Sequence, residues 1–463
     1  MKRISLLAIL IFAILMPLRL KAQFYDTGTD PASLRWKQIT TENFRLVFPS
    51  DYEKEAARTA ALLEEASERL NNIYRLPSRR PKLDILIHNH SIESNGYVAI
   101  APYRMELYPT PEQNSLPVDF RRRLINHEMV HVKQISALQT GVTGVLSRFG
   151  GQQYTGIVAA MLPFWFLEGD GIIYETLLTP GGRGTNPSFN KELKALYMGK
   201  PGGYSFDKML LGSYRHHTPS HYHYGFRMME FSRSKSGNNL WKDNVSYVAS
   251  KPFLINPLNF SLRKQASTTK KKLFTETFDE FSKLWHYESQ LDAPVEYTVV
   301  NPSKNDDYIN YYSPIIIGSD SLIAFKSSYS EPLSIVLIDK DLIEKRILYT
   351  GWVDPYFLSY GGGKMAWAEI QGDIRWENRG FSIIAVHDLA SGVTSRITRR
   401  SRLFAPAMSP DGYTIAAIET TTTNQSTIVF IDAVTGIIKD RLIPPGNSFP
   451  QRPAWSDDGT SIS

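Results

Sequence analysis

The chain has 463 residues, of which 42% are hydrophobic and 21% are charged. This ordinary balance excludes wholesale disorder, and the length suffices for about two to four domains. The absence of cysteine excludes disulfide bonds, thiolate metal sites and the lipid-modified cysteine of a bacterial lipoprotein.

The first residues are typical of a secretory signal peptide. A basic start, Met1–Arg3, precedes an apolar run from Ile4 to Leu15, and Ala22 is a small residue suited to cleavage. The run is too short to span a bilayer, and no other stretch predicts a transmembrane helix. We therefore expect an exported protein of a Gram-negative bacterium, either periplasmic, cell-surface-associated or secreted. Without the leader, 48 basic side chains face 46 acidic ones, so nucleic acid is not an expected partner.

Strands and helices are expected to alternate in the part that follows. Apolar residues recur at alternate positions in short stretches, and at spacings of three and four in longer ones. The patterns predict strands over Phe44–Phe48, Lys82–His88, Asn95–Ala101 and Arg104–Tyr108, and helices over Asp51–Tyr74, Asp119–Gln134, Asn190–Met198, Gly225–Ser234 and Thr275–Gln290. Between the helices expected at Asp119–Gln134 and Asn190–Met198, a loop rich in glycine and glutamine is expected at residues 150–153.

The helix expected at Asp119–Gln134 contains the pattern HExxH, formed by His127, Glu128 and His131. Two histidines four residues apart lie on the same face of a helix, where both imidazoles can hold one Zn²⁺. The intervening Glu128 comes close enough to act on a metal-bound water. The alternative is two unrelated helix histidines, one of them a satisfied core residue.

A zinc site of this kind needs one more protein ligand and leaves a fourth position for water. Metzincins take a third histidine six residues after the second, but Ala137 stands there. The segment Trp165–Gly169 instead matches the pattern WxxEG, in which a glutamate on a second helix completes the site. Residues from about Phe44 to Leu291 therefore resemble the gluzincins of the peptidase MA clan, which implies an α+β zincin-like catalytic domain.

This resemblance implies a role for each matching residue. His127, His131 and Glu168 would be the ligands of one Zn²⁺, and Glu128 the general base that takes a proton from the zinc-bound water. Glu175, seven residues after Glu168, matches an acidic position that hydrogen-bonds a ligand imidazole.

Gluzincins of the aminopeptidase type also use a tyrosine in a YxxG pattern as an oxyanion donor. The segment Tyr222–Gly225 matches it, and Tyr222 is the candidate, with Tyr224 and His223 as alternatives. The other reading is an aromatic-rich loop without a catalytic role. Asp170 stands where many relatives have apolar residues, so a different pocket polarity is expected. Without a clear GAMEN signature, aminopeptidase specificity is not carried over.

The remaining histidines form two groups. His88 and His90 make an HxH pattern, and four more lie between residues 216 and 223. Either group could bind a metal, but exposed loop histidines are the more frequent explanation.

Beyond residue 293 the residue pattern changes from helical periodicity to runs of β-branched residues separated by Gly, Asp and Ser. A repeated proline at 314, 355, 406 and 453 recurs after 41, 51 and 47 residues, which is typical of propeller blades. The third and fourth copies resemble the P-x-W-S-P-D-G turn of TolB-type β-propellers, as in Ala405–Gly412 and Arg452–Gly459. Asp-Gly closes a tight hairpin within a blade. Three blades and the start of a fourth cannot close a ring, so we expect a fragment of a longer protein.

The sequence thus predicts a signal peptide at 1–22, a gluzincin-like domain at 23–292 whose strand and helix half ends near residue 140, and an incomplete TolB-like propeller at 293–463. We expect a zinc metallopeptidase that hydrolyses peptide bonds in a peptide or protein substrate, with a propeller that binds substrate or a protein partner. One alternative is a periplasmic TolB-like binding or translocation scaffold with an inactive zinc domain, against which an intact Glu128 argues. Another is hydrolysis of a non-peptide bond.

Overall fold

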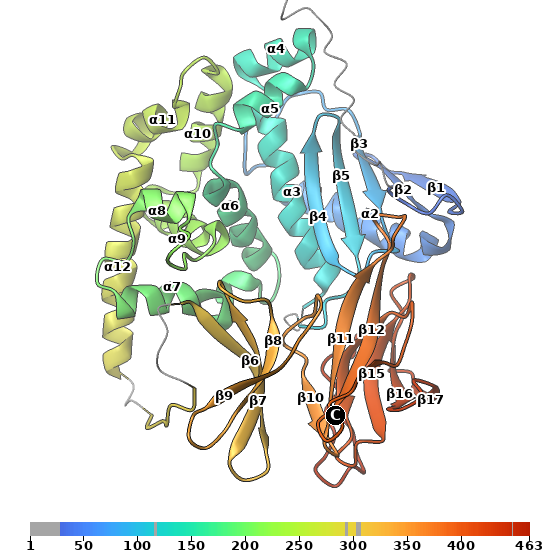
Figure 1. Ribbon diagram of the computed structural model, residues 1–463. Coiled ribbons are helices and arrows are strands. Elements are labelled where there is room, and N and C mark those ends of the chain that lie inside the picture. Colours follow the sequence, from blue (N-terminus) through green and yellow to red (C-terminus); the bar gives the residue numbers. More distant parts are fainter. Residues whose placement is uncertain (1–27, 115–117, 292–294, 302–306, 447) are drawn as a thin grey trace, which may run out of the picture.

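The computed structural model describes residues 28–114, 118–291, 295–301, 307–446 and 448–463. The expected leader at 1–22 lies outside these residues. An α+β region holds a five-stranded sheet with helices beside it, and three four-stranded sheets lie at the opposite end of the molecule from α4, Gly141–Gly150 (Figure 1).

The five-stranded sheet is mixed. Its order is β1 (Trp36–Thr40), β2 (Phe44–Pro49), β3 (Leu83–Ile87), β5 (Tyr103–Pro109) and β4 (Ser94–Ile100). The central strands β2, β3 and β5 run parallel, while β1 and β4 are antiparallel to their neighbours. All four strands predicted here are present, and β1 is additional. Because β4 lies at the edge of the sheet, one side of that strand has no strand partner among the described residues.

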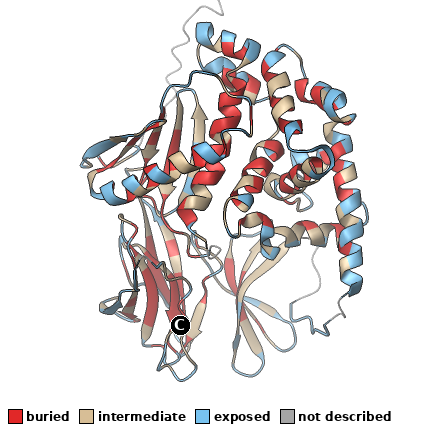
Figure 2. Ribbon diagram, turned by 180° about the vertical axis from the view of Figure 1, so that it is seen from behind, coloured by how far each residue is buried: buried red, intermediate tan, exposed pale blue. Residues whose placement is uncertain are grey.

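Two helices cover this sheet with their apolar faces. The short 3₁₀ turn η1 (Ser50–Tyr52) leads into α2 (Glu53–Arg69), and α3 (Phe120–Leu138) contains the HExxH residues. Leu63 of α2 and Met129 of α3 are buried in one core with Leu46 and Ile85 of the sheet. Figure 2 shows this core as buried residues on the facing sides of sheet and helices. This packing determines which face of α3 lies against the sheet and which face carries the HExxH side chains.

The following region is helical. Its elements are α4 (Gly141–Gly150), α5 (Gln153–Ala159), α6 (Phe164–Leu177), η2 (Arg183–Thr185), α7 (Pro187–Gly199), α8 (Phe206–Leu211), α9 (His221–Ser236), α10 (Asn239–Ser250), α11 (Pro257–Ala266) and α12 (Lys270–Leu291). The predicted helices correspond to α7, α9 and α12. Of the Gly- and Gln-rich loop expected at 150–153, only Gly151 and Gln152 lie between helices, because Gly150 ends α4 and Gln153 begins α5. The sequence did not predict these two helices. The glycines of α4 and α5 have low helix propensity, so these helices form because of their packing against the rest of the fold.

Two glycines let α6 and α9 cross closely. A Cβ on Gly169 would stand 2.5 Å from the carbonyl carbon of Gly225, and a Cβ on Gly225 would stand 2.2 Å from the carbonyl oxygen of Trp165. Only residues without a side chain permit such an approach. The glycine of the WxxEG pattern therefore has a packing role, because it lets the backbones of α6 and α9 touch.

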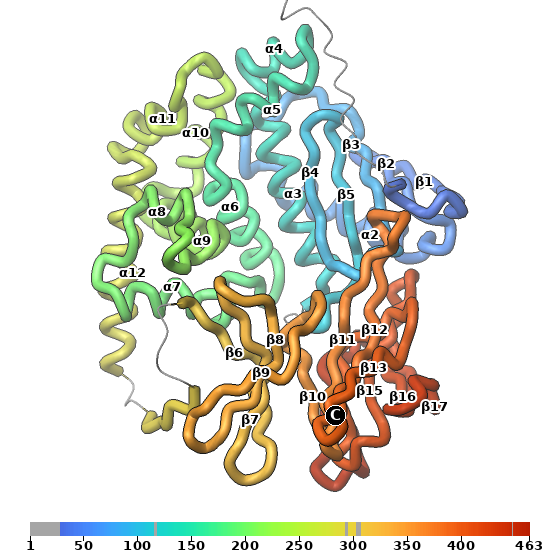
Figure 3. The backbone as a smooth tube through the Cα atoms, in the orientation of Figure 1, coloured from blue at the N-terminus to red at the C-terminus, as the bar shows by residue number. Residues whose placement is uncertain are grey.

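Three consecutive antiparallel sheets follow, each a four-stranded meander of the kind that forms propeller blades. The first contains β6 (Ile309–Ile317), β7 (Ser321–Ser328), β8 (Ser334–Ile338) and β9 (Glu344–Tyr349); the second β10 (Ser359–Gly361), β11 (Lys364–Gly372), β12 (Gly380–Asp388) and β13 (Thr394–Arg396); the third β14 (Leu403–Met408), β15 (Thr414–Thr420), β16 (Ser426–Asp432) and β17 (Ile438–Leu442). Figure 3 traces these sheets in chain order. The expected propeller-like repeats are thus present.

The repeated turns have a common structure. The hydroxyl of Ser409 donates to Asp411 at 2.5 Å, and that of Ser456 donates to Asp458 at 2.6 Å in the next copy. Gly412 and Gly459 follow with φ of +75° and +69°, a conformation that favours glycine. The SPDG-like pattern thus encodes the same tight turn twice.

The third sheet contacts the five-stranded sheet directly. Arg402 donates to the backbone oxygens of His90 and Ser91 at 3.2 and 2.9 Å, and to the hydroxyl of Thr110 at 3.0 Å. The amide of Asn424 donates to the carbonyl oxygen of Pro109 at 2.6 Å. These bonds hold the open end of the β4–β5 hairpin, where the chain enters β4 and leaves β5.

The interpretation of His88 as an exposed loop histidine is wrong. The imidazole is buried between Asp30 at 2.9 Å and Glu106 at 3.0 Å, and the amide of Asn378 lies 3.0 Å from Nδ1. His88 thus belongs to the contact between the two regions.

Within the described ranges, no single helix is both long and apolar enough to cross a membrane; α5 and α6, bent by 90°, reach that length and composition only as a pair.

Candidate metal centre

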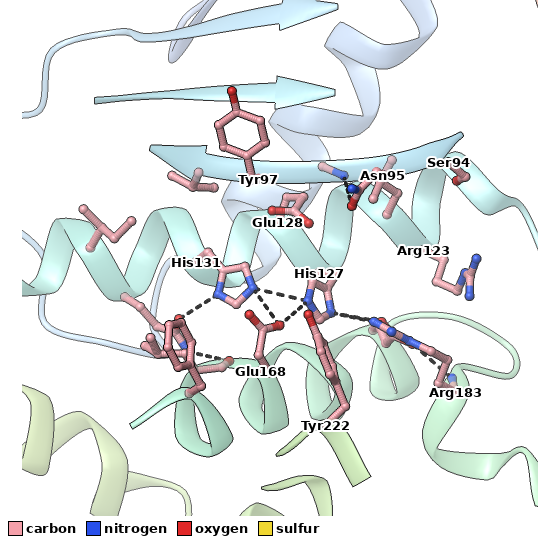
Figure 4. A pocket seen from close by; sticks show the side chains of 18 of the residues that line it. Ser94, Asn95, Tyr97, Arg123, His127, Glu128, His131, Glu168, Arg183 and Tyr222 are labelled. Atoms are coloured by element: carbon pink, nitrogen blue, oxygen red, sulfur yellow. Dashed lines mark hydrogen bonds and ion pairs between the residues drawn. The ribbon is translucent and has the colours of Figure 1, made fainter. Parts of the chain in front are cut away.

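The three predicted ligands come from two adjacent helices. Asp119 caps the start of α3, where its carboxylate accepts from the backbone N–H groups of Arg121 and Arg122. His127 and His131 follow on one face of α3, and Glu168 reaches them from α6 (Figure 4). The structure therefore brings all three together.

The donor atoms of these residues form a nearly equilateral triangle. His127 Nε2 lies 3.1 Å from Glu168 Oε2 and 3.2 Å from His131 Nε2, and His131 Nε2 lies 3.4 Å from Glu168 Oε2. Ligands 2.0–2.1 Å from a tetrahedral zinc stand about 3.3 Å apart. The triangle therefore fits a zinc ion. Among the described residues, this is the one group of three His, Cys, Asp or Glu side chains close enough to share a metal.

The other nitrogen of each imidazole is also occupied. His127 Nδ1 lies 3.0 Å from Glu175 Oε2, and His131 Nδ1 lies 2.9 Å from Gln134 Oε1. Such bonds fix the ring orientation and the tautomer of a metal-binding histidine, leaving Nε2 for the metal. Gln134 is held in turn by donating to the backbone oxygen of Leu167 at 3.2 Å.

Arg183 of η2 extends this arrangement. Its Nε and Nη2 donate to the two carboxylate oxygens of Glu175 at 2.8 and 2.7 Å, and its backbone N–H donates at 3.1 Å. Burial alone would raise the pKa of Glu175, but the charge and hydrogen bonds of Arg183 outweigh it and hold that pKa well below the usual range. Glu175 therefore stays a carboxylate.

The electrostatics of the triangle favour a cation. Burial works against the charged form of His131, but the hydrogen bond and charge of Glu168 outweigh it and raise the pKa of His131 to about 9. Burial would likewise raise the pKa of Glu168, but hydrogen bonds from the two imidazoles hold it far below the usual range. A position that stabilises a proton this strongly also suits a metal ion.

Glu128 is buried beside the triangle and has an unsatisfied oxygen. Its Oε2 has no hydrogen-bond partner within the described part of the chain. A buried carboxylate oxygen of this kind calls for a water or a ligand group. Burial, the largest influence, raises the pKa of Glu128 above the usual value, which suits a proton acceptor working near neutral pH.

The edge strand β4 lies directly over Glu128. A Cβ on Gly96 would stand 2.7 Å from Glu128 Cγ. The glycine thus gives the carboxylate its room, and it brings the backbone of β4 to the reacting side of α3.

Among the three aromatic candidates of the YxxG segment, Tyr222 lines the cleft and points at the triangle (Figure 4). Burial, followed by the charge of Glu168, raises the pKa of Tyr222 to about 12, so its hydroxyl remains a donor. Tyr224 is buried in the helical core, and His223 stacks on Phe189.

The expected effect of Asp170 on pocket polarity is wrong. Its carboxylate is fully buried away from the cleft, where it pairs with Arg233 and accepts from the hydroxyl of Tyr74. The residue after Glu-Gly therefore stabilises the helical core.

The triangle lies at the floor of a cleft of about 340 Å³. One wall is β4 from Ser94 to Val98, and the opposite wall comes from α6 and from Tyr222. Arg123 and Arg183 contribute positive charge to the lining, and its apolar side chains include Ile135, Leu138, Ala159, Phe164 and Leu167.

Sequence reasoning missed Arg183 and the role of Gln134. Gln134 stands three residues after His131, which places it on the same helix face and could have been noticed. Arg183 is surrounded by Gly181, Gly182 and Gly184, a sign of a loop built for close approach. Nothing in the sequence says which carboxylate that loop meets.

No family model matches the chain, and no curated protein matches it. Solved structures that resemble part of it are TolB-like β-propeller proteins and propeller peptidases. A putative TolB from Agrobacterium tumefaciens is 18% identical over 31% of this chain and 49% of that one, with a TM-score of 0.26. TolB from Acinetobacter baumannii is 19% identical over 35% of this chain and 38% of that one, with a TM-score of 0.27.

The β-propeller domain of the Trilobed protease from Pyrococcus furiosus is 11% identical over 30% of this chain and 43% of that one, with a TM-score of 0.21. The chain thus spans about half, or less, of the length of these structures.

Proposed function

We propose that this chain is an exported, gluzincin-like zinc metallopeptidase that hydrolyses peptide bonds. The observation that carries the proposal is the triangle of His127, His131 and Glu168, with the unsatisfied carboxylate of Glu128 beside it. These four groups are the donor set and proton acceptor that zinc-dependent hydrolysis needs.

Each residue then has a defined task. His127, His131 and Glu168 would hold one Zn²⁺, which supplies Lewis acidity towards water and towards a carbonyl group. Glu128 accepts a proton from water at its carboxylate and passes it to the nitrogen of the leaving amine. Tyr222 donates from its hydroxyl to the developing oxyanion. Glu175, held by Arg183, keeps the Nδ1–H of His127 in place.

The edge strand supports a peptide as the substrate. β4 ends its sheet and forms a wall of the cleft, so an extended peptide can pair with its free backbone groups. Gly96 brings this backbone close to Glu128, which places a bound peptide bond near the proton acceptor.

In this proposal, residues 23–292 form the catalytic domain, and residues 293–463 belong to a TolB-like propeller that binds substrate or a protein partner. The bonds from Arg402 and Asn424 to the ends of the β4–β5 hairpin support a role near the substrate strand. The leader at 1–22 supports export to the periplasm, the cell surface or the medium.

Metal analysis combined with a Glu128→Gln variant tests the proposal. We expect one equivalent of zinc in both proteins, and a loss of cleavage of a denatured-protein substrate by a factor of about a hundred or more in the variant. Glu280→Gln, at an exposed position of α12, is the matched control and should cleave like the wild type.

Absence of zinc from the purified protein, after incubation with the metal, would overturn the proposal. Stoichiometric zinc without hydrolysis of any peptide by the wild type would instead support the alternative, a TolB-like scaffold with an inactive zinc domain. Hydrolysis confined to esters or other non-peptide bonds would correct the substrate class alone.

A further inference from the structure

Exposed apolar side chains gather at the end of the molecule opposite the three four-stranded sheets. They come from α4, α5 and the loop between α10 and α11, which lie together at that end (Figure 1). The set, here named the apolar end, contains Val142, Val145, Phe149, Ile157, Phe253 and Ile255. Phe149 is 90% exposed, Phe253 80% and Ile255 100%. Grouped apolar residues of this exposure mark an interaction surface.

The amphipathic orientation of α4 is reversed relative to a core helix. Val142, Val145 and Phe149 recur at spacings of three and four, so they share one face, and that face is exposed. The inward positions hold the small and polar residues Thr143 and Gly144, both buried. Burial inside this protein therefore does not explain why α4 carries its apolar residues.

The geometry of the apolar end is fixed by inward contacts. The hydroxyl of Thr143 donates to the backbone oxygen of Ala249 in α10 at 2.8 Å. Ser147 of α4 and Thr155 of α5 share a hydrogen bond of 2.8 Å. These polar bonds hold α4 and α5 with their apolar sides outwards, next to the α10–α11 loop.

The charge of this end is one-sided. The chain has no Asp or Glu from Gln134 to Leu167, and none from Asn244 to Thr275. Arg148 precedes Phe149, and Lys251 stands two residues before Phe253. Both cations are exposed, and across the described ranges neither forms a salt bridge. Along these two segments of the chain, the apolar side chains are thus accompanied by positive charge alone.

We propose that the apolar end docks the protein on the surface of a membrane that contains anionic lipid. Exposed Phe, Ile and Val side chains enter the boundary between headgroups and acyl chains, while Arg148 and Lys251 meet anionic headgroups. The propeller sheets then point away from the membrane, since they lie at the opposite end. This inference does not depend on the zinc site.

Flotation with vesicles tests the proposal. The purified protein should bind vesicles of phosphatidylcholine that contain about 30% phosphatidylglycerol, an anionic lipid that gives the vesicle a negative surface potential. It should bind less to vesicles of pure phosphatidylcholine, and less at high salt. A double variant, Phe149→Ser with Phe253→Ser, should lose affinity by about tenfold or more, because both aromatic rings lose their lipid contact. The control is Ile316→Ser with Val434→Ser, which removes exposed apolar residues from the propeller sheets.

A second measurement reports the orientation directly. The chain has no cysteine, so Phe149→Cys and Val434→Cys each introduce a unique site for an environment-sensitive fluorophore. The label at 149 should shift to the blue on anionic vesicles, and the label at 434 should not. Equal vesicle binding by the Phe149/Phe253 double variant and the wild type would refute the proposal. So would concentration-dependent dimerisation abolished by that variant, without lipid binding, since the face would then join two copies of the chain.

Discussion

Arg183 donates to both carboxylate oxygens of Glu175, from Nε to Oε1 at 2.8 Å and from Nη2 to Oε2 at 2.7 Å. Through Glu175 the pair also reaches His127 Nδ1. A bidentate pair between a guanidinium and a buried carboxylate has a fixed geometry. Arg183 therefore fixes Glu175, and Glu175 in turn fixes the orientation of the His127 ring.

Glu175→Gln and Arg183→Met are therefore expected to weaken zinc binding by about 10–100-fold, because the His127 ring loses its fixed partner. Competition with a chromophoric chelator measures this affinity directly. Arg263→Met on α11 removes a cation outside the cleft and should leave the affinity unchanged. Zinc affinity equal to wild type in both site variants would show that the pair has another purpose.

Gly96→Ala should reduce hydrolysis by about tenfold or more while zinc remains bound, because the new methyl group would stand 2.7 Å from Glu128 Cγ and displace that carboxylate. The measurements are kcat and the zinc content of each variant, and only kcat should fall in Gly96→Ala. Gly372→Ala at the end of β11 is the matched strand control, since a Cβ there meets nothing within 4 Å. Unchanged kcat in Gly96→Ala would mean that Glu128 can move without consequence.

Asp170→Asn is expected to destabilise the fold by about 3–5 kcal/mol, because Arg233 would keep its charge in a buried place without a counter-ion. Urea denaturation followed by tryptophan fluorescence measures the free energy of unfolding. The exposed Asp279→Asn on α12 serves as the comparison, with an expected change below about 0.5 kcal/mol. A variant as stable as wild type would contradict the structural role of Asp170.

The contact around His90 should make stability depend on pH. Burial, with Arg402 and Arg379 adding to it and Asp51 and Asp30 opposing it, lowers the pKa of His90. The unfolded chain then binds this proton more readily than the folded chain, so the free energy of unfolding falls as pH drops below about 6.5.

His90→Gln removes this contribution, so its stability should fall less between about pH 7.5 and 5.5 than that of the wild type. Urea titrations at several pH values provide the comparison. His286→Gln, on α12, should follow the wild-type curve. If the free energy of unfolding fell equally with pH in His90→Gln and wild type, another group would cause the loss of stability at low pH.

Local patterns in the sequence predicted much of the scaffold around the site. The alternating strands β2 to β5 and the long helices α2 and α3 follow from the spacing of apolar residues. HExxH fixed the common face of His127 and His131, because four residues make about one helical turn. The spacing of the repeated prolines likewise predicted the four-stranded sheets.

What the sequence could not provide are relations between distant segments. The meeting of Arg183 with Glu175 depends on how η2 folds back on α6, and the burial of Asp170 depends on Arg233 from α9. His88 read as a loop residue because its partners, Asp30 and Asn378, lie far away along the chain. Such long-range pairs have no periodic signature.

The bonds from the third sheet to the β4–β5 hairpin have a consequence for the order of maturation. Synthesis produces β4 long before Arg402 and Asn424, which bond to Ser91 ahead of β4 and to Pro109 at the end of β5. We expect α3 and its histidines to fold early, whereas the strand that borders the cleft reaches its final position only after the third sheet has formed. A nascent chain would thus form the helix with His127 and His131 first, and the cleft beside it would reach its final shape only after the third sheet.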